Sequence, residues 1–420
     1  MQSLIFFTSI IVYTVYSFSP VHNGVKLNTF RSLFMTNSPA ESNQDGISSK
    51  DNIKSSVKNF GNNLGAAAAG VAASSLLSST TMPSVANAAK EKIWTKVDLP
   101  VSNTLFDISF DPKNPDHGWL VGAKGTFLET FDGGYTWKNR EFSSLDEDED
   151  INYRFEVASL NEDEGWIVGK PAIMLHTRDG GKQFERIPLS PKLPGEPVSI
   201  VGTALSQAEM VTSQGAVYTT TNGGLNWKAQ VKETIDATLN RVSSSGTSGA
   251  SYFTGKILNQ IRDKNGNYIA ISSRGNLFLT WAPGQDYWIP HNRGSARRIQ
   301  NMGFIENDVK NGIWMTLNGG ALLKTGPNPD LTQVEFEDQF TSAKINSGGY
   351  GIIDATWIDD KRAWAVGGSG VIFNSVDGGQ TWKYNSDGKS VPGNLYRVRF
   401  FGENKGWALG SDGVLLKYNA

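Results

Sequence analysis

One two-part phrase recurs along this chain and constrains its fold more than any other feature. The first half places tryptophan after a small residue and glycine a few positions later, as in GWLVG at 118–122, GWIVG at 165–169 and GWALG at 406–410. The second half reads Thr/Ser-x-Asp/Asn-Gly-Gly before an aromatic residue, as in TFDGGYTW at 130–137 and SVDGGQTW at 375–382. The recurrence predicts a fold assembled from copies of one small unit.

The spacing of the copies predicts the kind of unit. Successive first halves are separated by about 40 to 60 residues, which is the length of a propeller blade and longer than most helical repeats. Two weaker copies bring the number of first halves to seven, at 118–122, 165–169, 208–215, 268–275, 312–316, 363–367 and 406–410. We therefore predict an all-β fold, a seven-bladed β-propeller, in a single domain over 90–420.

The two ends of this region complement each other. The last copy, at 406–420, stops before its second half, whereas KIWTKVDLP at 92–100 resembles a second half that no first half precedes. We expect the N-terminal strand around Trp94 to complete the C-terminal blade and close the ring. Such closure leaves no sheet edge open to aggregation.

The second halves explain how each unit turns. Asp-Gly-Gly or Asn-Gly-Gly between two β-rich runs is a strong hairpin signal, because glycine adopts positive φ at little cost. The Asp or Asn oxygen accepts backbone N–H groups across the turn. This is the Asp-box pattern of sialidases and other propellers, and it normally lies away from any active site. We predict structural turn roles for four side chains: Asp132, Asp179, Asn222 and Asp377.

The first 89 residues read as targeting segments. A short apolar run makes 1–17 a predicted secretory signal peptide, with a signal anchor as the alternative. Residues 18–58 are rich in Ser and Asn and poor in acids, which is typical of a plastid transit peptide. A second signal-like segment at 59–89 predicts delivery to the thylakoid lumen.

The junction between the first two segments indicates the kind of plastid. Ser17-Phe18 resembles the cleavage signature of proteins imported into complex plastids of red-algal ancestry. The second signal has Lys58-Asn59 where a twin arginine is expected, so the route across the thylakoid membrane stays open.

The composition argues against most catalytic and metal-binding chemistry. The chain has no cysteine, and its four histidines include no His-x-x-x-His pair. It contains no Gly-x-Ser-x-Gly, phosphate-binding glycine loop or His-Glu-x-x-His motif. The acidic run at 146–150 lacks EF-hand spacing, so a solvated insertion is favoured over a calcium loop. A formal net charge of −2 gives no attraction to nucleic acid. We expect no cofactor, no metal and no nucleic-acid partner.

The segment 241–298 is much more basic than the chain as a whole. It contains eight basic and two acidic residues, a local charge of +6. Arginine suits bidentate carboxylate recognition, and aromatic residues lie among these arginines as they do at interaction hot spots. A solvated basic face without a partner is the alternative. The predicted partner-binding residues are Arg241, Arg274, Arg293, Arg297, Arg298 and Trp281.

The same region closely resembles one protein family. SSRGNLFLTWAPGQDYWIPHNRGSARRIQNMGF at 272–304 and NRVSSSGTSGASYFTGKI at 240–257 are similar to the photosystem II stability/assembly factor family, and the similarity extends over 91–420. The resemblance implies a non-enzymatic lumenal propeller that promotes reaction-centre assembly. It implies that an arginine-rich face binds the newly made, C-terminally extended precursor of the reaction-centre core polypeptide. Arg154, Arg397 and Arg399 stand before inner-strand regions of other blades and are weaker candidates.

The resemblance also sets expectations about assembly. It implies contact with early assembly intermediates and association with the thylakoid membrane through these partners. We expect the free protein to be monomeric.

Two other functions remain open from the residues alone. A sialidase-type glycosidase would share the propeller and the Asp boxes. It would also need three arginines, a Tyr–Glu pair and an acid/base Asp around the central axis. No segment resembles that family's N-terminal arginine motif, and the arginines cluster in one stretch. A generic extracellular scaffold would be favoured if the tagged protein were secreted instead of entering the plastid.

Overall fold

The computed structural model describes residues 92–142, 153–242, 256–332 and 336–419. The segments predicted as signal peptide, transit peptide, lumen-targeting segment and acidic insertion lie outside the described residues, at 1–17, 18–58, 59–89 and 146–150.

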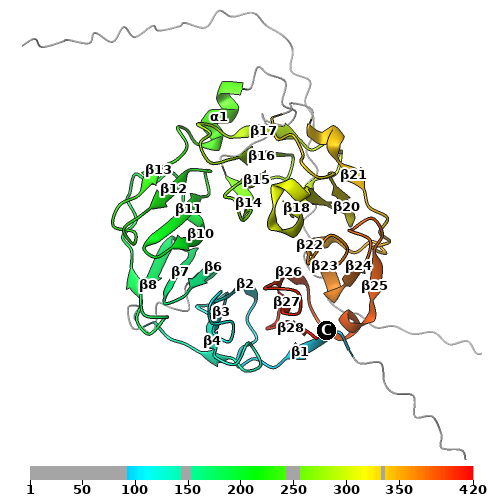
Figure 1. The fold of residues 1–420 in the computed structure, drawn as a ribbon, viewed down its shortest axis with the longest axis horizontal. Coiled ribbons are helices and arrows are strands. Elements are labelled where there is room, and N and C mark those ends of the chain that lie inside the picture. The colour runs from blue at the N-terminus through cyan, green and yellow to red at the C-terminus, as the bar shows by residue number, and fades with distance from the viewer. Residues whose placement is uncertain (1–91, 143–152, 243–255, 333–335, 420) are drawn as a thin grey trace, which may run out of the picture. The chain divides into compact units, whose positions relative to one another are not determined.

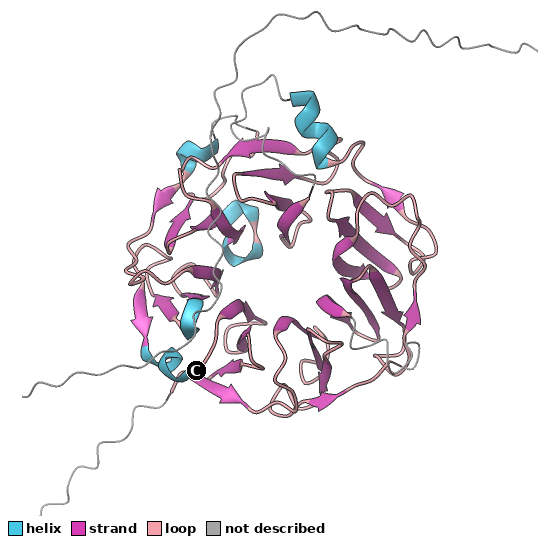
Figure 2. Ribbon diagram, turned by 180° about the vertical axis from the view of Figure 1, so that it is seen from behind, coloured by secondary structure: helices cyan, strands magenta, loops and turns pink. Residues whose placement is uncertain are grey.

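The described residues form seven four-stranded antiparallel sheets arranged around a central axis (Figure 1). Each sheet is one blade, and its strands follow one another from the axis outward. Seen from behind, the ring consists almost entirely of strands and loops (Figure 2). The predicted seven-bladed, all-β propeller is confirmed.

Blades 1 to 4 follow the chain in order. Blade 1 comprises β2 (Leu105–Phe110), β3 (Gly118–Gly122), β4 (Phe127–Thr130) and β5 (Lys138–Asn139). Blade 2 comprises β6 (Arg154–Asn161), β7 (Glu164–Lys170), β8 (Ile173–Thr177) and β9 (Glu185–Arg186). Blade 3 comprises β10 (Pro197–Ala204), β11 (Gln207–Thr212), β12 (Val217–Thr220) and β13 (Lys228–Ala229). Blade 4 comprises β14 (Ile257–Arg262), β15 (Tyr268–Ser272), β16 (Leu277–Trp281) and β17 (Ile289–Asn292).

Blades 5 to 7 complete the ring. Blade 5 comprises β18 (Ile299–Phe304), β19 (Ile313–Leu317), β20 (Ala321–Lys324) and β21 (Thr341–Ser342). Blade 6 comprises β22 (Ile352–Trp357), β23 (Ala363–Gly367), β24 (Ile372–Ser375) and β25 (Lys383–Asn385). Blade 7 comprises β26 (Leu395–Phe400), β27 (Gly406–Gly410), β28 (Leu415–Tyr418) and β1 (Trp94–Val97). The first half of the repeated phrase therefore marks the second strand of every blade.

Short helices lie in the connections. They are α1 (Ile235–Val242) and the 3-10 helices η4 (Ile305–Asn307), η5 (Val309–Asn311), η6 (Phe336–Gln339), η7 (Gly368–Gly370) and η8 (Ser386–Ser390). No helix in the described part of the chain is long and apolar enough to cross a membrane.

The N-terminal strand closes the ring, as the sequence predicts. β1 pairs antiparallel with β28, with Trp94 opposite Tyr418. The indole of Trp94 is buried, and its ring centroid lies 5.3 Å from that of Trp364 in the neighbouring blade 6. Because the outer strand of blade 7 comes from the start of the domain, the two ends of the domain are held by one sheet.

Apolar packing between neighbouring blades holds the ring together. The described residues form seven hydrophobic clusters, and each contains buried side chains from two adjacent blades. Trp407 and Leu409 of blade 7, for example, pack with Leu120 and Leu128 of blade 1. Burial of this apolar surface is the main favourable contribution to the fold.

The second Asp-box glycine permits this packing. Gly134 has φ +84°, and a Cβ added there would lie 2.5 Å from Cη2 of Trp407 in the preceding blade. Gly181 has φ +90°, and its Cβ would lie 2.8 Å from Cζ2 of Trp119. A side chain at either position would therefore be strained and would displace a buried indole.

Strand alternation gives the ring two distinct faces. Hairpins between the first and second strands, and those between the third and fourth strands, lie on one face, which carries the Asp boxes. We call it the Asp-box face. Hairpins between the second and third strands and the connections between blades lie on the opposite face, which we call the connector face.

Candidate functional site

The fold places all five predicted arginines on the connector face. Arg274 lies in the hairpin between β15 and β16, and Arg293, Arg297 and Arg298 lie in the connection from β17 to β18. Arg241 lies in α1, within the connection from β13 to β14, and its side chain is outside the described part of the structure.

A backbone hydrogen bond brings two of these loops together. The N–H of Ile299 donates to the carbonyl of Gly275 at 2.8 Å. Arg274 and Arg298 each precede one member of this pair, so they lie on neighbouring loops of blades 4 and 5. The side chains of Arg274, Arg297 and Arg298 are exposed. We call these three residues the arginine surface.

Arg293 shapes this surface from within its own loop. Its Nη2 donates to the carbonyl of Ala296 at 3.2 Å, and its Nε donates to the carbonyl of Ser295. The N–H of Arg297 donates to Oγ of Ser295 at 3.1 Å. The Arg293 guanidinium therefore positions the loop that presents Arg297.

Trp281 requires a correction. The sequence interpretation gave it a contact with the partner, but the structure places it in the core at 4% exposure. Its Nε1 donates to the carbonyl of Gln285 at 2.8 Å, and its ring packs against Tyr268 and Trp288. An indole enclosed in this way supports blade 4 and presents no surface to a partner.

The Asp-box side chains organise their own turns. Oδ1 of Asp132 accepts from the backbone N–H groups of Tyr135 and Thr136, each at 2.9 Å. Its Oδ2 accepts from Oγ1 of Thr136 at 2.6 Å. Burial alone would raise the pKa of Asp132, but these hydrogen bonds lower it to about 2. Asp179, Asn222 and Asp377 accept equivalent bonds in their turns.

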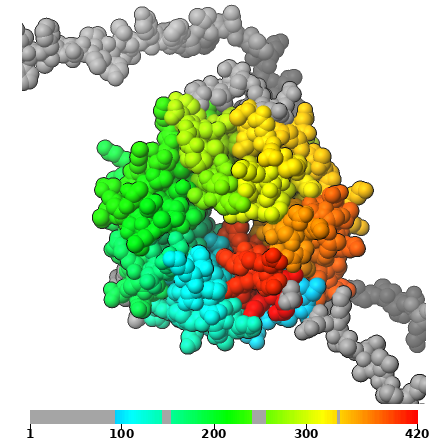
Figure 3. Space-filling model, viewed as in Figure 1, coloured from blue at the N-terminus to red at the C-terminus, as the bar shows by residue number. Residues whose placement is uncertain are grey.

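A cavity of about 690 Å³ lies on the axis and is lined by the inner strands. The space-filling view is hollowed at this point (Figure 3). Each inner strand has a bulge near its start. The residues that follow the bulge differ in chemistry from blade to blade: Asp107, Val157, Ser199, Asn259, Asn301, Asp354 and Arg397. Hairpin residues of the Asp-box face, such as Asn307 and Glu403, also line the cavity.

Polar side chains in this cavity join neighbouring blades. Arg397 of blade 7 forms an ion pair with Asp107 of blade 1. Asp354 of blade 6 accepts from the N–H of Val398 at 2.9 Å and from Nδ2 of Asn301 at 3.0 Å. Burial raises the pKa of Asp354, although the positive charge of Arg399 opposes the shift.

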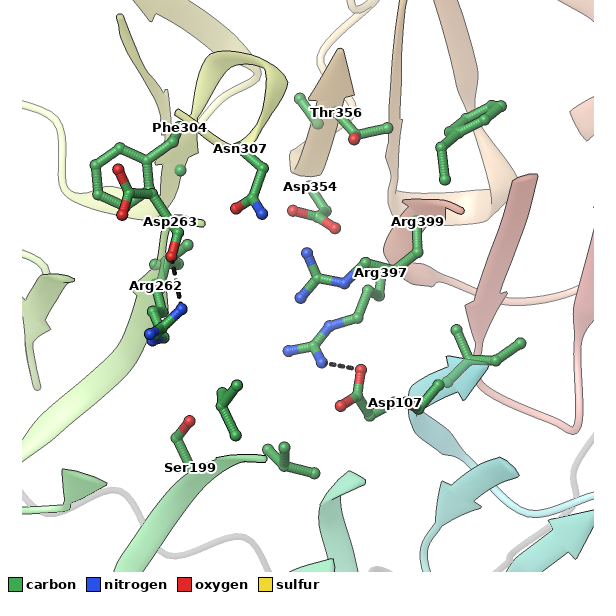
Figure 4. Close-up of a pocket in the computed structure, with 18 of the residues that line it drawn as sticks. Asp107, Ser199, Arg262, Asp263, Phe304, Asn307, Asp354, Thr356, Arg397 and Arg399 are labelled. Atoms are coloured by element: carbon green, nitrogen blue, oxygen red, sulfur yellow. Dashed lines mark hydrogen bonds and ion pairs between the residues drawn. The ribbon is translucent and has the colours of Figure 1, made fainter. Parts of the chain in front are cut away.

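The weaker sequence candidates lie apart from the arginine surface. Arg397 and Arg399 are part of inner strand β26, not before it, and they project into the cavity opposite Arg262 (Figure 4). Arg154 begins β6, where its guanidinium lies 4.1 Å from the ring centroid of Phe106. Sequence reasoning missed Arg262 as a cavity residue, because no repeated motif marks the inner strands.

The three cavity arginines can be compared with the three that a sialidase-type glycosidase would need around its central axis. Arg262 forms an ion pair with Glu209, with 2.7 Å between Nε and Oε2, and Arg397 forms an ion pair with Asp107. Tyr268 donates to the same Oε2 of Glu209 at 3.0 Å, but its side chain is completely buried, and burial raises its pKa. A hydroxyl enclosed between blades cannot reach a sugar in the cavity, so this Tyr–Glu pair does not meet the geometric requirement.

Known proteins resemble the chain over the whole propeller. A family model described as "Photosynthesis system II assembly factor YCF48" matches residues 86–419. The chloroplastic photosystem II stability/assembly factor HCF136 of Guillardia theta is 56% identical over 77% of this chain and 82% of that relative. HCF136 of Cyanidioschyzon merolae is 54% identical over 78% of this chain and 74% of that relative.

Solved structures of family members also resemble the chain. YCF48 from Cyanidioschyzon merolae superposes with a TM-score of 0.74 at 50% identity, covering 78% of this chain and 99% of that one. A structure described as YCF48 bound to D1 peptide has a TM-score of 0.67 at 38% identity, covering 79% and 96%. A xyloglucanase from Xanthomonas campestris, at 14% identity and a TM-score of 0.54, shares the fold alone.

Proposed function

Because the chain belongs to the photosynthesis system II assembly factor YCF48 family, we propose that it binds the newly made precursor of the reaction-centre polypeptide D1. It promotes reaction-centre assembly and repair by this binding and without catalysis. A solved relative bound to a D1 peptide supports this partner. Relatives described as chloroplastic support a plastid location, and the segment at 59–89 supports the thylakoid lumen within it.

The arginine surface is the observation that carries this proposal. Arg274, Arg297 and Arg298 are exposed, and none forms an ion pair with a described residue. Neighbouring guanidiniums without acidic partners attract carboxylates, and each can bind one through two parallel hydrogen bonds. A partner segment that supplies carboxylates would therefore be held on the connector face.

The axial cavity supports a function without turnover. Two of its three arginines are paired with carboxylates of this chain, and Tyr268 is enclosed. The lining residues instead connect neighbouring inner strands, as Asp354 does between blades 5, 6 and 7.

A double charge reversal tests the proposed site. Arg297→Glu with Arg298→Glu replaces two attractive charges by two repulsive ones. We expect affinity for a synthetic D1-precursor peptide to fall at least tenfold, because each lost charge-assisted bond is worth about 1.5–3 kcal/mol. Fluorescence anisotropy measures the affinity, and circular dichroism checks that the melting temperature is retained.

A matched control changes the same charge on the opposite face. Lys182 and Lys361 are exposed on the Asp-box face, and neither forms an ion pair with a described residue. Lys182→Glu with Lys361→Glu should leave binding nearly unchanged. Equal affinity loss in both double variants, or none in either, would remove the arginine surface from the mechanism. Binding through the arginine surface should also weaken as salt increases.

A further inference from the structure

A second concave site lies on the connector face, beside blade 6. It is a pocket of about 410 Å³, which lies within the usual size range of ligand sites. Val371 and the buried ring of Phe373 form its apolar floor. Tyr350 and Tyr384 form walls and are 48% and 47% exposed, and Lys389 lies at the rim. We call this site the tyrosine pocket.

A glycine turn of blade 5 lies between the tyrosine pocket and the arginine surface. A Cβ built on Gly319 would lie 3.6 Å from Nη1 of Arg297. The next residue, Gly320, approaches Oγ of Ser347 and the carbonyl of Tyr350 so closely that it has no room for a side chain. One glycine turn of blade 5 therefore lies beside Arg297 on one side and against the pocket wall on the other.

The chemistry of the pocket suits one part of a peptide. Half-exposed tyrosines that flank a buried phenylalanine offer aromatic area to an apolar side chain, as in many protein interfaces. The centroids of Phe373 and Tyr384 are 5.8 Å apart at 73°, so the wall ring stands nearly edge-on to the floor ring. Lys389 is exposed and forms no ion pair with a described residue. The site therefore combines an apolar floor with a cation for a neighbouring carboxylate.

The adjoining backbone leaves space for a second chain. Gly351 follows Tyr350, its φ lies outside the left-handed range, and a Cβ added there would meet no atom within 4 Å. Neither strain nor packing within the described chain requires glycine at this position. Glycine does permit close approach by another backbone.

We propose that the tyrosine pocket binds an apolar side chain of the same D1-precursor segment whose carboxylates contact the arginine surface. This inference rests on the proposed function and extends its site across blades 4 to 6. The arginines supply charge attraction, and the pocket fixes the register of the segment by accepting one side chain.

Two tyrosine truncations test the pocket by fluorescence anisotropy with the synthetic D1-precursor peptide. Tyr384→Ala and Tyr350→Ala should each weaken binding about tenfold, as at an aromatic hot spot. Tyr384→Phe keeps the ring and should bind within about twofold of the unchanged protein. Tyr135→Ala removes a largely exposed tyrosine from the Asp-box face and should leave affinity unchanged.

The peptide supplies the complementary half of the test. Each apolar peptide residue is replaced by alanine in turn, and affinity is measured against the unchanged protein and against Tyr384→Ala. One replacement should weaken binding to the unchanged protein and have little further effect on Tyr384→Ala, because the two changes remove the same contact. If the two effects add for every replacement, no peptide side chain contacts Tyr384 and the inference is wrong.

The outcomes separate this inference from the proposed function. If both tyrosine variants bind normally while Arg297→Glu/Arg298→Glu fails, the pocket is excluded and the proposed function stands. If neither kind of variant changes the affinity, both proposals fail. Gly351→Ala should retain the melting temperature and weaken the peptide complex severalfold, whereas unchanged affinity would exclude close backbone approach at this point.

Discussion

Closure of the ring depends on a tryptophan whose indole makes no hydrogen bond with the described residues. Trp94 is 1% exposed, and its ring centroid lies 5.3 Å from that of Tyr418 and 6.1 Å from that of Phe400. Its Nε1 has no hydrogen-bond partner among the described residues. Truncation in Trp94→Ala therefore removes apolar packing and leaves no newly unpaired partner. We predict that this single change destabilises the whole propeller.

The magnitude follows from burial. Truncating a buried tryptophan to alanine costs about 3–5 kcal/mol, which includes the cavity left behind. An unfolding entropy of about 2.1 cal/mol/K per residue gives about 0.7 kcal/mol/K for a domain of roughly 330 residues. The melting temperature should therefore fall by about 4–7 °C.

Differential scanning calorimetry measures this shift, with Leu225→Ala as the control. Leu225 is largely exposed in the Asp-box turn of blade 3, so its truncation should change stability by no more than about 0.5 kcal/mol. Deleting residues 90–99 should destabilise the domain further, because β28 then loses its outer partner strand β1. A Trp94→Ala protein with the same melting temperature as the unchanged protein would refute closure by β1.

Two further predictions concern the Asp-box turns. Hydrogen bonds from Thr381 lower the pKa of Asp377 from 3.8 to about 2, so its charged form stabilises the fold above pH 3.8 and this contribution is lost as the pH falls toward 2. Asp377→Asn should flatten that part of the stability curve, as urea unfolding between about pH 2 and 5 would show. Gly134→Ala should cost about 2 kcal/mol or more, because strain at φ +84° adds to the clash with Trp407. Differential scanning calorimetry measures this loss. Gly284 has φ +90°, and a Cβ built on it has no atom within 4 Å, so Gly284→Ala measures the cost of the backbone strain without a clash.

The sequence predicted those parts of the fold that repeat. The first half of the repeated phrase became the second strand of each blade, although the weaker copies in blades 3 and 4 contain no tryptophan there. A buried strand between two others requires similar apolar residues every time. The unmatched ends of the domain predicted closure through Trp94, because the incomplete last copy needs an outer strand from elsewhere in the chain. Blade 5 has no Asp box, and the residues between β20 and β21 include η6 instead, so the turn motif could not mark this blade.

The candidate site was predictable only in part. A charge cluster is visible in the sequence, and alternating strands bring Arg274 and Arg298 to one face. Solvent exposure is decided by packing, so the sequence could not show that Trp281 is buried or that Arg293 binds its own loop. The axial cavity has no repeated sequence pattern, because the residue after the bulge differs in chemistry from blade to blade, as Asp107 and Arg397 show.

Hydrogen–deuterium exchange with and without the D1-precursor peptide tests the central claim most directly. Bound peptide should slow amide exchange at 273–276 and 293–298, the two loops that carry the arginine surface. Exchange in the Asp-box turn at 130–136, on the opposite face, should stay unchanged. Protection confined to the Asp-box turns or to the inner strands would contradict binding of the D1 precursor by the connector face.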